Sequence, residues 1–487
     1  MIAQPRRRSR QAFVIGALLL VAGCAGAPVY RPASVYPSGT AATAAFREAG
    51  AWAEATAPAA PQGDWWHALG DPQLDALEAR LATDSPTLAA ALARSDAAQQ
   101  ALRVAQADAL PTIGSAAAIG VNRQSDDRPL RSASQPTVYG NNIAGLGAGY
   151  EVDLWGRVRD SIAAGRADAV ASADDAAAIR LSLQAQLATT YIVLRGLDTE
   201  ADLLQRTIAV YAEADSVVRN RFAGGVATAI DTGRAAAQLA DAQAQLADVR
   251  AVRARLEHAI ATLVGTPASA FALPVARDTL HVAIMPTGLP STLLLRRPDV
   301  AAAERRMYAA NRAIGVARAA FFPTIDLAAG GGTNATSLAG LAVAGNAFWA
   351  LGPTLALTLF DGGRRTAQVR AARARWDEAG AAYRTTALTA FQEVEDSLAA
   401  LHHYGDEDNA QLRAADQAQQ AADLSMLRYE KGVSNYLDVV TAQTTALFEQ
   451  RRAIEVRTLR LNAAVALARA VGGGWGTAGR SSLAKPG

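Results

Sequence analysis

One short sequence pattern occurs twice in this chain, and it constrains the fold more than any other feature. Residues 221–231 read RFAGGVATAID, and residues 428–438, roughly 207 positions later, read RYEKGVSNYLD. Arg, an aromatic residue, Gly, Val and Asp recur at the same positions. Each copy lies between long segments rich in Ala, Leu, Gln, Arg and Glu. This arrangement is typical of the tip of a helical hairpin, and we therefore predict one large unit that has been duplicated.

Turn chemistry in the two copies supports a hairpin tip. Gly225 and Gly432 can adopt the left-handed conformation that ends a helix. Thr228 and Ser434 are candidate caps of the helices that follow, Thr228 together with Asp231 three residues later.

Composition favours long packed helices and excludes nucleic-acid binding as the main role. Hydrophobic residues make up 51% of the chain, but much of this share is alanine and aromatic residues make up only 6%. The net charge is +2, and residues 1–23 hold four arginines and no acidic residue. Without that segment the chain is slightly acidic, so the basic patch expected of a nucleic-acid partner is missing.

The first residues read as a lipoprotein signal peptide over 1–23. A basic stretch precedes a short apolar run, and Val21-Ala22-Gly23-Cys24 has the form of a lipobox. Cys24 is the only cysteine, so no internal disulfide forms. We expect a covalent lipid on Cys24 and no other cofactor; Ala25 favours sorting to the outer membrane. The alternative is an ordinary secretory signal with an incidental cysteine.

Two pairs of strands interrupt the helical pattern. Residues about 112–122, 143–154, 324–332 and 349–360 alternate between apolar and small or polar side chains, which is typical of strands in a membrane barrel. Residues 339–360 carry no charge and could form a membrane helix, but Pro353 and the alternation favour a strand. Four strands cannot close a barrel and two chains give too narrow a pore, so we predict three chains and twelve strands.

The predicted chain organisation follows from these elements. The ranges are a signal peptide (1–23), a lipidated tether (24–70), a first repeat (71–264), a compact connecting segment (265–297), a second repeat (298–472) and a disordered tail (473–487).

No catalytic or metal site is evident, and we expect no enzyme activity. Only two of the histidines are adjacent, and no Cys or carboxylate cluster has metal-binding spacing; the histidines are His67, His258, His281, His402 and His403. One pattern of charged residues is notable near the second tip.

Asp416, Asp423 and Glu430 are spaced by seven, which puts them on one stripe of a helix near the second tip. The stripe lies either on a solvated outer face or in the lumen, where three chains would form a periplasmic gate of carboxylates.

Several motifs together resemble the TolC/OprM outer-membrane factors, and the NodT-type lipoprotein branch fits best. These motifs are Cys24, the segment 150–157 (YEVDLWGR), Arg296-Arg297-Pro298-Asp299, the segment 314–325 and the two tips. The resemblance spans about residues 24–472. It implies a membrane α+β fold: a homotrimer whose twelve-stranded outer-membrane β-barrel continues into a long α-helical coiled-coil periplasmic barrel. Residues 24–70 and 265–297 would form the equatorial belt.

The resemblance also implies a function. Such proteins are passive exit ducts of tripartite efflux systems, which export drugs or other small molecules and so contribute to antibiotic resistance. The implied partners are a periplasmic adaptor, an inner-membrane pump of the RND type and outer-membrane lipid, without nucleic acid. A type I protein-secretion duct shares the fold and remains an alternative. A periplasmic adaptor lipoprotein is a second rival, but it would have a single hairpin and lipoyl-like strands.

The tips are the candidate docking site for the adaptor, although the same residues also suit a plain turn. The predicted docking residues are Arg221, Phe222, Gly225, Val226, Arg428, Tyr429, Gly432 and Val433.

Overall fold

The protein is described from a computed structural model. The structure describes residues 26–35, 46–48, 64–125, 127, 134–276, 280–282 and 297–473. Cys24, the predicted signal peptide, much of the predicted tether and residues 474–487 lie outside these ranges.

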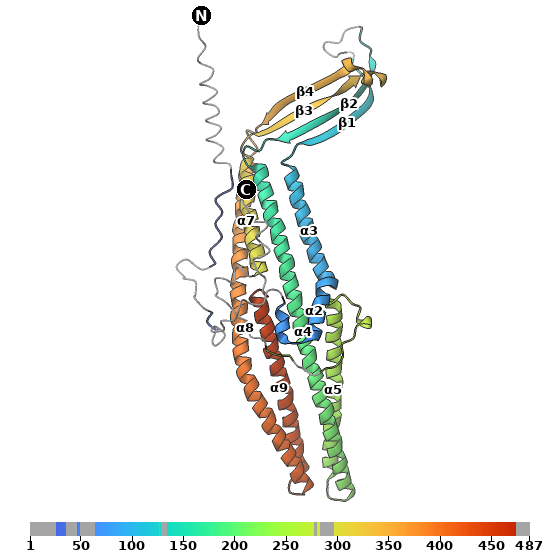
Figure 1. Cartoon of the computed structure of the whole chain (residues 1–487), viewed down its shortest axis with the longest axis vertical. Helices are drawn as coiled ribbons and strands as arrows, with labels where there is room; N and C mark the ends of the chain where they lie inside the picture. Colours follow the sequence, from blue (N-terminus) through green and yellow to red (C-terminus); the bar gives the residue numbers. More distant parts are fainter. Residues whose placement is uncertain are drawn as a thin grey trace. The chain divides into compact units, whose positions relative to one another are not determined.

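The chain divides into two compact units, each made of three separated stretches. The sheet unit comprises Met1–Ala33, Ser95–Ser172 and Ala303–Tyr383. The hairpin unit comprises Ser34–Arg94, Ala173–Ala302 and Arg384–Gly487. The four strands labelled in Figure 1 belong to the first unit, and the two helical tips belong to the second.

Helix lengths recur in the same order along the chain. The first series is α3 (Pro86–Ala107, 22 residues), α4 (Arg157–Ala223, 67) and α5 (Ala229–Leu263, 35). The second is α7 (Pro298–Ala319, 22), α8 (Arg364–Glu430, 67) and α9 (Tyr436–Ala470, 35). At 1.5 Å per residue, α4 and α8 are each about 100 Å long. A shorter helix, α2 (Pro72–Asp84), precedes the first series and is capped by the carboxylate of Asp71.

Four antiparallel strands form one sheet in the order β1-β2-β3-β4. They are β1 (Thr112–Arg123), β2 (Val138–Glu151), β3 (Thr324–Ala335) and β4 (Ala347–Ala356). The register pairs Ser115 with Leu146, Leu146 with Gly331, and Gly331 with Trp349. Because directly paired residues lie on the same face of a sheet, the apolar faces predicted strand by strand combine into one.

The ends of two strands differ from the prediction, and for one of them, β4, the reason is clear. The strand expected over 143–154 runs from Val138 to Glu151, and the one expected over 349–360 ends at Ala356. Thr324 pairs with Ala356, and the residue before it is Pro323. Proline has no N–H to continue the ladder, so the pairing stops there and residues 357–360 lie beyond the strand.

The junction between helices and strands is held by an aromatic stack. The rings of Trp155 and Phe322 are stacked with centroids 4.8 Å apart, and Trp155 Nε1 donates to the carbonyl oxygen of Pro323 at 2.6 Å. The turn into α4 is thereby fixed to the turn between α7 and β3. Glu151, at the end of β2, accepts two hydrogen bonds from the guanidinium of Arg157, at 2.7 and 2.5 Å.

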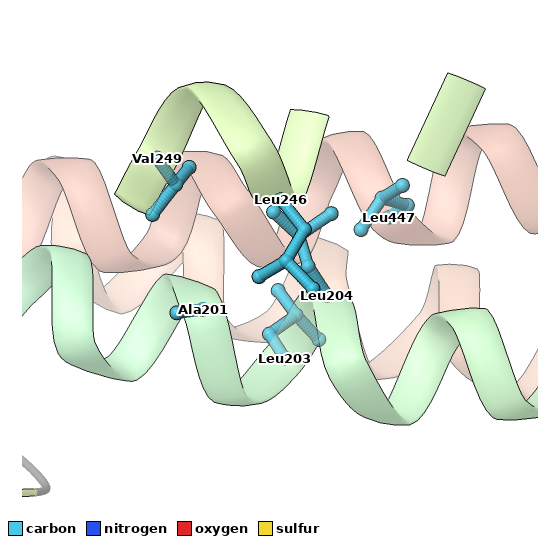
Figure 2. Close-up of a cluster of buried hydrophobic side chains, with 6 residues drawn as sticks. All are labelled: Ala201, Leu203, Leu204, Leu246, Val249 and Leu447. Carbon is cyan, nitrogen blue, oxygen red and sulfur yellow. The ribbon is translucent and has the colours of Figure 1, made fainter. Parts of the chain in front are cut away.

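A small apolar core joins helices of the hairpin unit. Figure 2 shows side chains from α4, α5 and α9 that converge on one another; they are Ala201, Leu203, Leu204, Leu246, Val249 and Leu447. A second cluster lies near the tips and joins Val218 of α4 and Ala235 of α5 to Tyr429, Tyr436 and Val439. These clusters fix the two hairpins of one chain against each other.

The connection before α7 is held by ion pairs and carries no strand in its described part. Of the connecting segment predicted over 265–297, residues 266–276 and 280–282 are described here, and they contain one 3₁₀ turn, Ala268–Ala270. Arg297, in the Arg-Arg-Pro-Asp segment, binds Asp299 at 2.7 Å and Glu393 of α8 at 2.5 Å. Among the described residues, no helix has the length and apolarity needed to cross a membrane.

Candidate functional site

The two tips have the same backbone geometry. Gly225 and Gly432 adopt φ angles of 74° and 75°, in the left-handed region that the sequence predicted. The N–H of Val226 donates to the carbonyl oxygen of Arg221 at 2.8 Å, and the N–H of Val433 donates to that of Arg428 at 2.9 Å. These bonds close the last turns of α4 and α8, so each tip is a helix end of the same type.

One of the two predicted caps is confirmed and the other is wrong. Thr228 forms a capping box with Asp231, as expected. In the second tip the cap is Asn435, whose side-chain oxygen accepts from the N–H of Asp438 at 3.0 Å, and not Ser434. Asn435 holds the position that corresponds to Thr228 in the first copy, and an amide oxygen caps as well as a hydroxyl.

The predicted docking residues do not all face outward. Val226 is 69% exposed, Val433 is 65% exposed and Phe222 is 49% exposed. Tyr429 is only 5% exposed, because its ring packs against that of Tyr436 at 5.2 Å. Among the predicted docking residues, the exposed apolar surface therefore comes from the two valines and Phe222.

Arg221 has a role that the sequence did not reveal. Its Nη1 donates to the carbonyl oxygen of Tyr429 at 2.6 Å and to that of Glu430 at 3.4 Å. Its guanidinium carbon lies 4.6 Å from the centre of the Tyr429 ring. Arg221 thus links the first tip to the C-terminal end of α8. The side chain of Arg428, its counterpart, is exposed and forms no hydrogen bond or ion pair with the described residues.

The predicted stripe of carboxylates lies beside a buried seam. Asp416, Asp423 and Glu430 are all exposed in the single chain. Each directly follows a buried residue, in a series one position earlier: Ala415, Ala422 and Tyr429. The carboxylates therefore lie next to the buried line of α8, on its exposed side.

Beyond the tips, the N-terminal segment is fixed to the sheet unit. The N–H of Ala27 donates to Asp160 Oδ2 at 3.2 Å, and Arg312 lies 3.4 Å from Asp160 Oδ1. A Cβ atom on Gly315 would come within 1.9 Å of Asp160 Oδ2 and 2.8 Å of the Ala27 nitrogen. Only glycine leaves room at this position, so the backbone just after Cys24 is held against α4 and α7.

No metal centre is found in the part of the chain that the structure describes, where no group of three or more His, Cys, Asp or Glu could hold an ion. His67 instead approaches a carboxylate, with its Nδ1 2.7 Å from Asp75 Oδ1. The rings of His402 and His403 lie 5.1 Å apart on α8.

Comparison with known proteins identifies the class of protein. Residues 78–266 and 289–473 match the profile of the family described as outer membrane efflux protein. The chain is 35% identical over 474 residues to outer membrane protein OprJ of Pseudomonas aeruginosa, covering 96% of this chain and 97% of that one. It is 33% identical over 470 residues to the pyoverdine export outer membrane protein OpmQ of the same species, covering 95% and 96%.

Solved structures agree with this comparison. The open state of the Neisseria gonorrhoeae MtrE outer membrane channel is similar with a TM-score of 0.80 and 30% identity, covering 93% of this chain and 99% of that one. The outer-membrane channel OprN is similar with a TM-score of 0.84 and 26% identity, covering 93% and 100%.

This chain belongs to the outer membrane efflux protein family. It is the outer-membrane component of an efflux system, which confirms the function and location inferred from the motifs. Membership of this family, whose members form channels, also agrees with the expectation that the chain is not an enzyme.

Proposed function

We propose that three copies of this chain close a twelve-stranded barrel and form the passive exit duct of a tripartite efflux system. The sheet carries this proposal. Its outer strands, β1 and β4, each pair with only one neighbour among the residues that the structure describes. A strand edge with unpaired N–H and C=O groups is not tolerated in lipid, so the β1 edge of one copy must meet the β4 edge of another.

The two faces of the sheet differ as a membrane barrel requires. One face carries large apolar side chains; they include Ile113, Leu146, Leu327, Leu351 and Leu355. The other is dominated by small or polar residues; they include Gly114, Gly147, Gly330, Thr354 and Gly352. The apolar face suits contact with lipid. The small residues leave room for water and solutes inside a wide barrel. Solutes could therefore pass through it passively, without a catalysed step.

The helices support a periplasmic extension of the duct. The recurring series of 22, 67 and 35 residues favours an internal duplication, in which each copy contributes a hairpin to a coiled-coil barrel. Three chains would then supply six similar hairpins, and residues 24–70 and 265–297 would form a belt around them.

The exposed tips are the proposed docking site for a periplasmic adaptor, which would connect the duct to an inner-membrane pump of the RND type. Val226 and Val433 expose large apolar side chains to solvent, and each follows a glycine that adopts a left-handed φ angle in the turn. Val433→Glu should abolish efflux while the trimer stays intact, because a charge there opposes burial against a partner. Val275→Glu is the matched control, since Val275 is 71% exposed in a segment outside the tips. Unchanged efflux in Val433→Glu would contradict docking at this tip.

The relatives indicate the kind of cargo. OpmQ is named for pyoverdine export, and another relative, TtgF of Pseudomonas putida, for a toluene efflux pump; TtgF is 34% identical over 359 residues. These names favour drugs, solvents or other small molecules over a protein substrate, so we propose small-molecule efflux, with antibiotics among the cargo.

The lipid on Cys24 is the proposed second anchor in the outer membrane. Gly26 and Ala27, two and three residues after Cys24, are held to α7 and α4, which supports an anchor at this end of the chain. The barrel strands would provide most of the anchoring.

Native mass spectrometry of the detergent-extracted protein tests the central proposal. We expect a homotrimer that conducts ions in planar bilayers, and a gene deletion that lowers resistance to small apolar compounds. A stable monomer or dimer that still restores resistance would refute the shared barrel. The deletion should be combined with knockouts of candidate inner-membrane pumps, because loss of the cognate pump should give no further sensitivity.

A further inference from the structure

We propose that Arg428 binds the C-terminal end of α4 in a neighbouring copy, donating to the carbonyl oxygens of Phe222 and Ala223 and covering the Phe222 ring. The partner is a second copy of this chain. The inference rests on the proposed trimer and specifies which residues join one chain to the next at the tips.

The contact within the chain is the template for this pairing. Arg221 donates to the carbonyl oxygens of Tyr429 and Glu430, at 2.6 and 3.4 Å, and its guanidinium lies over the Tyr429 ring. Those carbonyls form the negative end of the α8 dipole, so a cation is favoured there. The aromatic face adds a cation–π attraction.

Every group in this contact has a counterpart in the other copy of the motif. Arg428 stands where Arg221 stands, Phe222 where Tyr429 stands, and Ala223 where Glu430 stands. The local backbone is also the same: the N–H of Gly225 donates to the Phe222 carbonyl oxygen at 2.9 Å, and the N–H of Gly432 donates to that of Tyr429 at 2.9 Å. The end of α4 therefore presents the same acceptors and an aromatic ring to an arginine.

Only one of the two possible contacts is made inside the chain. Tyr429 is 5% exposed beneath Arg221, whereas Phe222 is 49% exposed. The guanidinium of Arg428 is itself exposed and forms no hydrogen bond or ion pair with the described residues. The tips thus leave one free donor and one free acceptor surface, which match each other.

A free donor on one hairpin and a free acceptor on the other define a head-to-tail interface. Such an interface repeats from copy to copy and closes into a ring when the rotation allows it. In a trimer, three contacts within chains and three between chains would then be alike. Each hairpin tip would be held on both sides, and opening the duct at this end would require breaking these arginine contacts.

Cross-linking tests the pairing directly. Arg428→Cys combined with Ala223→Cys should give covalently linked dimers and trimers on denaturing gels after treatment with a short bis-maleimide. Arg221→Cys combined with Glu430→Cys is the matched control, because it should give a link within one chain. The parent, with Cys24 as its only cysteine, should give neither. A native trimer without linked oligomers would overturn the pairing, whereas a monomeric native protein would overturn the trimer itself.

A double-variant comparison tests whether the arginine and the ring act on each other. Arg428→Ala and Phe222→Ala should each lower the temperature at which the trimer dissociates, and the double variant should lower it no further than the more affected single variant. Arg413→Ala is the control, since Arg413 is exposed on the same helix; its shift should simply add to that of Phe222→Ala. Strictly additive shifts for Arg428 and Phe222, in a protein that remains a trimer, would show that they do not touch.

Discussion

Glu78 on α2 provides a quantitative test of how the hairpin unit is packed. Its side chain is fully buried, and neither carboxylate oxygen has a hydrogen-bond partner among the described residues. Burial, together with the nearby negative charge of Asp75, raises the pKa of Glu78 from 4.5 to about 9. The folded protein therefore keeps a proton on this carboxyl group at neutral pH that the unfolded chain has lost.

The sign of the pH effect follows from this difference. Because the folded-state pKa is the higher one, folding stability is undiminished below pH 4.5 and falls as the pH rises from 4.5 towards 9. Each pH unit costs about 1.4 kcal/mol, so at pH 7.5 the cost reaches about 4 kcal/mol as an upper limit. Glu78→Gln has nearly the same shape and cannot ionise. It should be more stable than the parent at pH 7.5 by up to that amount, and no more stable near pH 4.5.

Urea unfolding followed by the helical circular dichroism signal at pH 5 and pH 8 measures this difference. Glu213→Gln is the matched control, because it makes the same substitution at an exposed position of α4. If Glu78→Gln and the parent differ by the same amount at pH 5 and at pH 8, Glu78 is not a buried neutral acid and the reasoning fails.

Three further predictions follow from other parts of the chain. Mass spectrometry of the mature N-terminus should find a triacylated Cys24, and Cys24→Ser should still insert as a trimer; an unmodified cysteine would contradict the anchor. Gly315→Ala should destabilise the protein by about 2 kcal/mol, because the new methyl group displaces Asp160. Gly345→Ala, with open space around it, should not, and equal unfolding midpoints for both would refute the clamp. Asp416→Ala combined with Asp423→Ala should lower cation selectivity in bilayer recordings if the stripe lines the gate; unchanged selectivity would place it outside.

Periodicity predicted most of the fold because each element is long and repeats a simple pattern. The long helices, the two strand pairs and the left-handed glycines at the tips were all evident from residue spacing. The predicted strand ends were less accurate. Apolar and small residues alternate past Ala356 in the sequence, but Pro323 ends the pairing on the neighbouring strand, β3. The apolar pattern of one strand does not show where the neighbouring strand stops offering backbone N–H groups for pairing.

The tips show the limit of sequence reasoning about a site. Arg221 and Arg428 are equivalent in the sequence, and both were predicted to meet an adaptor. Only the structure shows that Arg221 points to the end of α8. Likewise the matching positions of Tyr429 and Phe222 did not reveal that one is buried and the other half exposed. Contacts between hairpins depend on how the copies pack, and a repeat by itself does not specify which copy completes a pair.

The unpaired edges of the sheet have a consequence for the newly made chain on its way to the membrane. Until β1 and β4 find partners, a single copy carries two open strand edges and an apolar face through the aqueous periplasm, which invites aggregation. The glycines of β2 and β3 reduce this hazard, because glycine has a low β-propensity and offers no side chain for unintended pairing. Glycine-rich strands would therefore delay sheet formation until the chains meet at the bilayer, so that assembly and insertion become a single event.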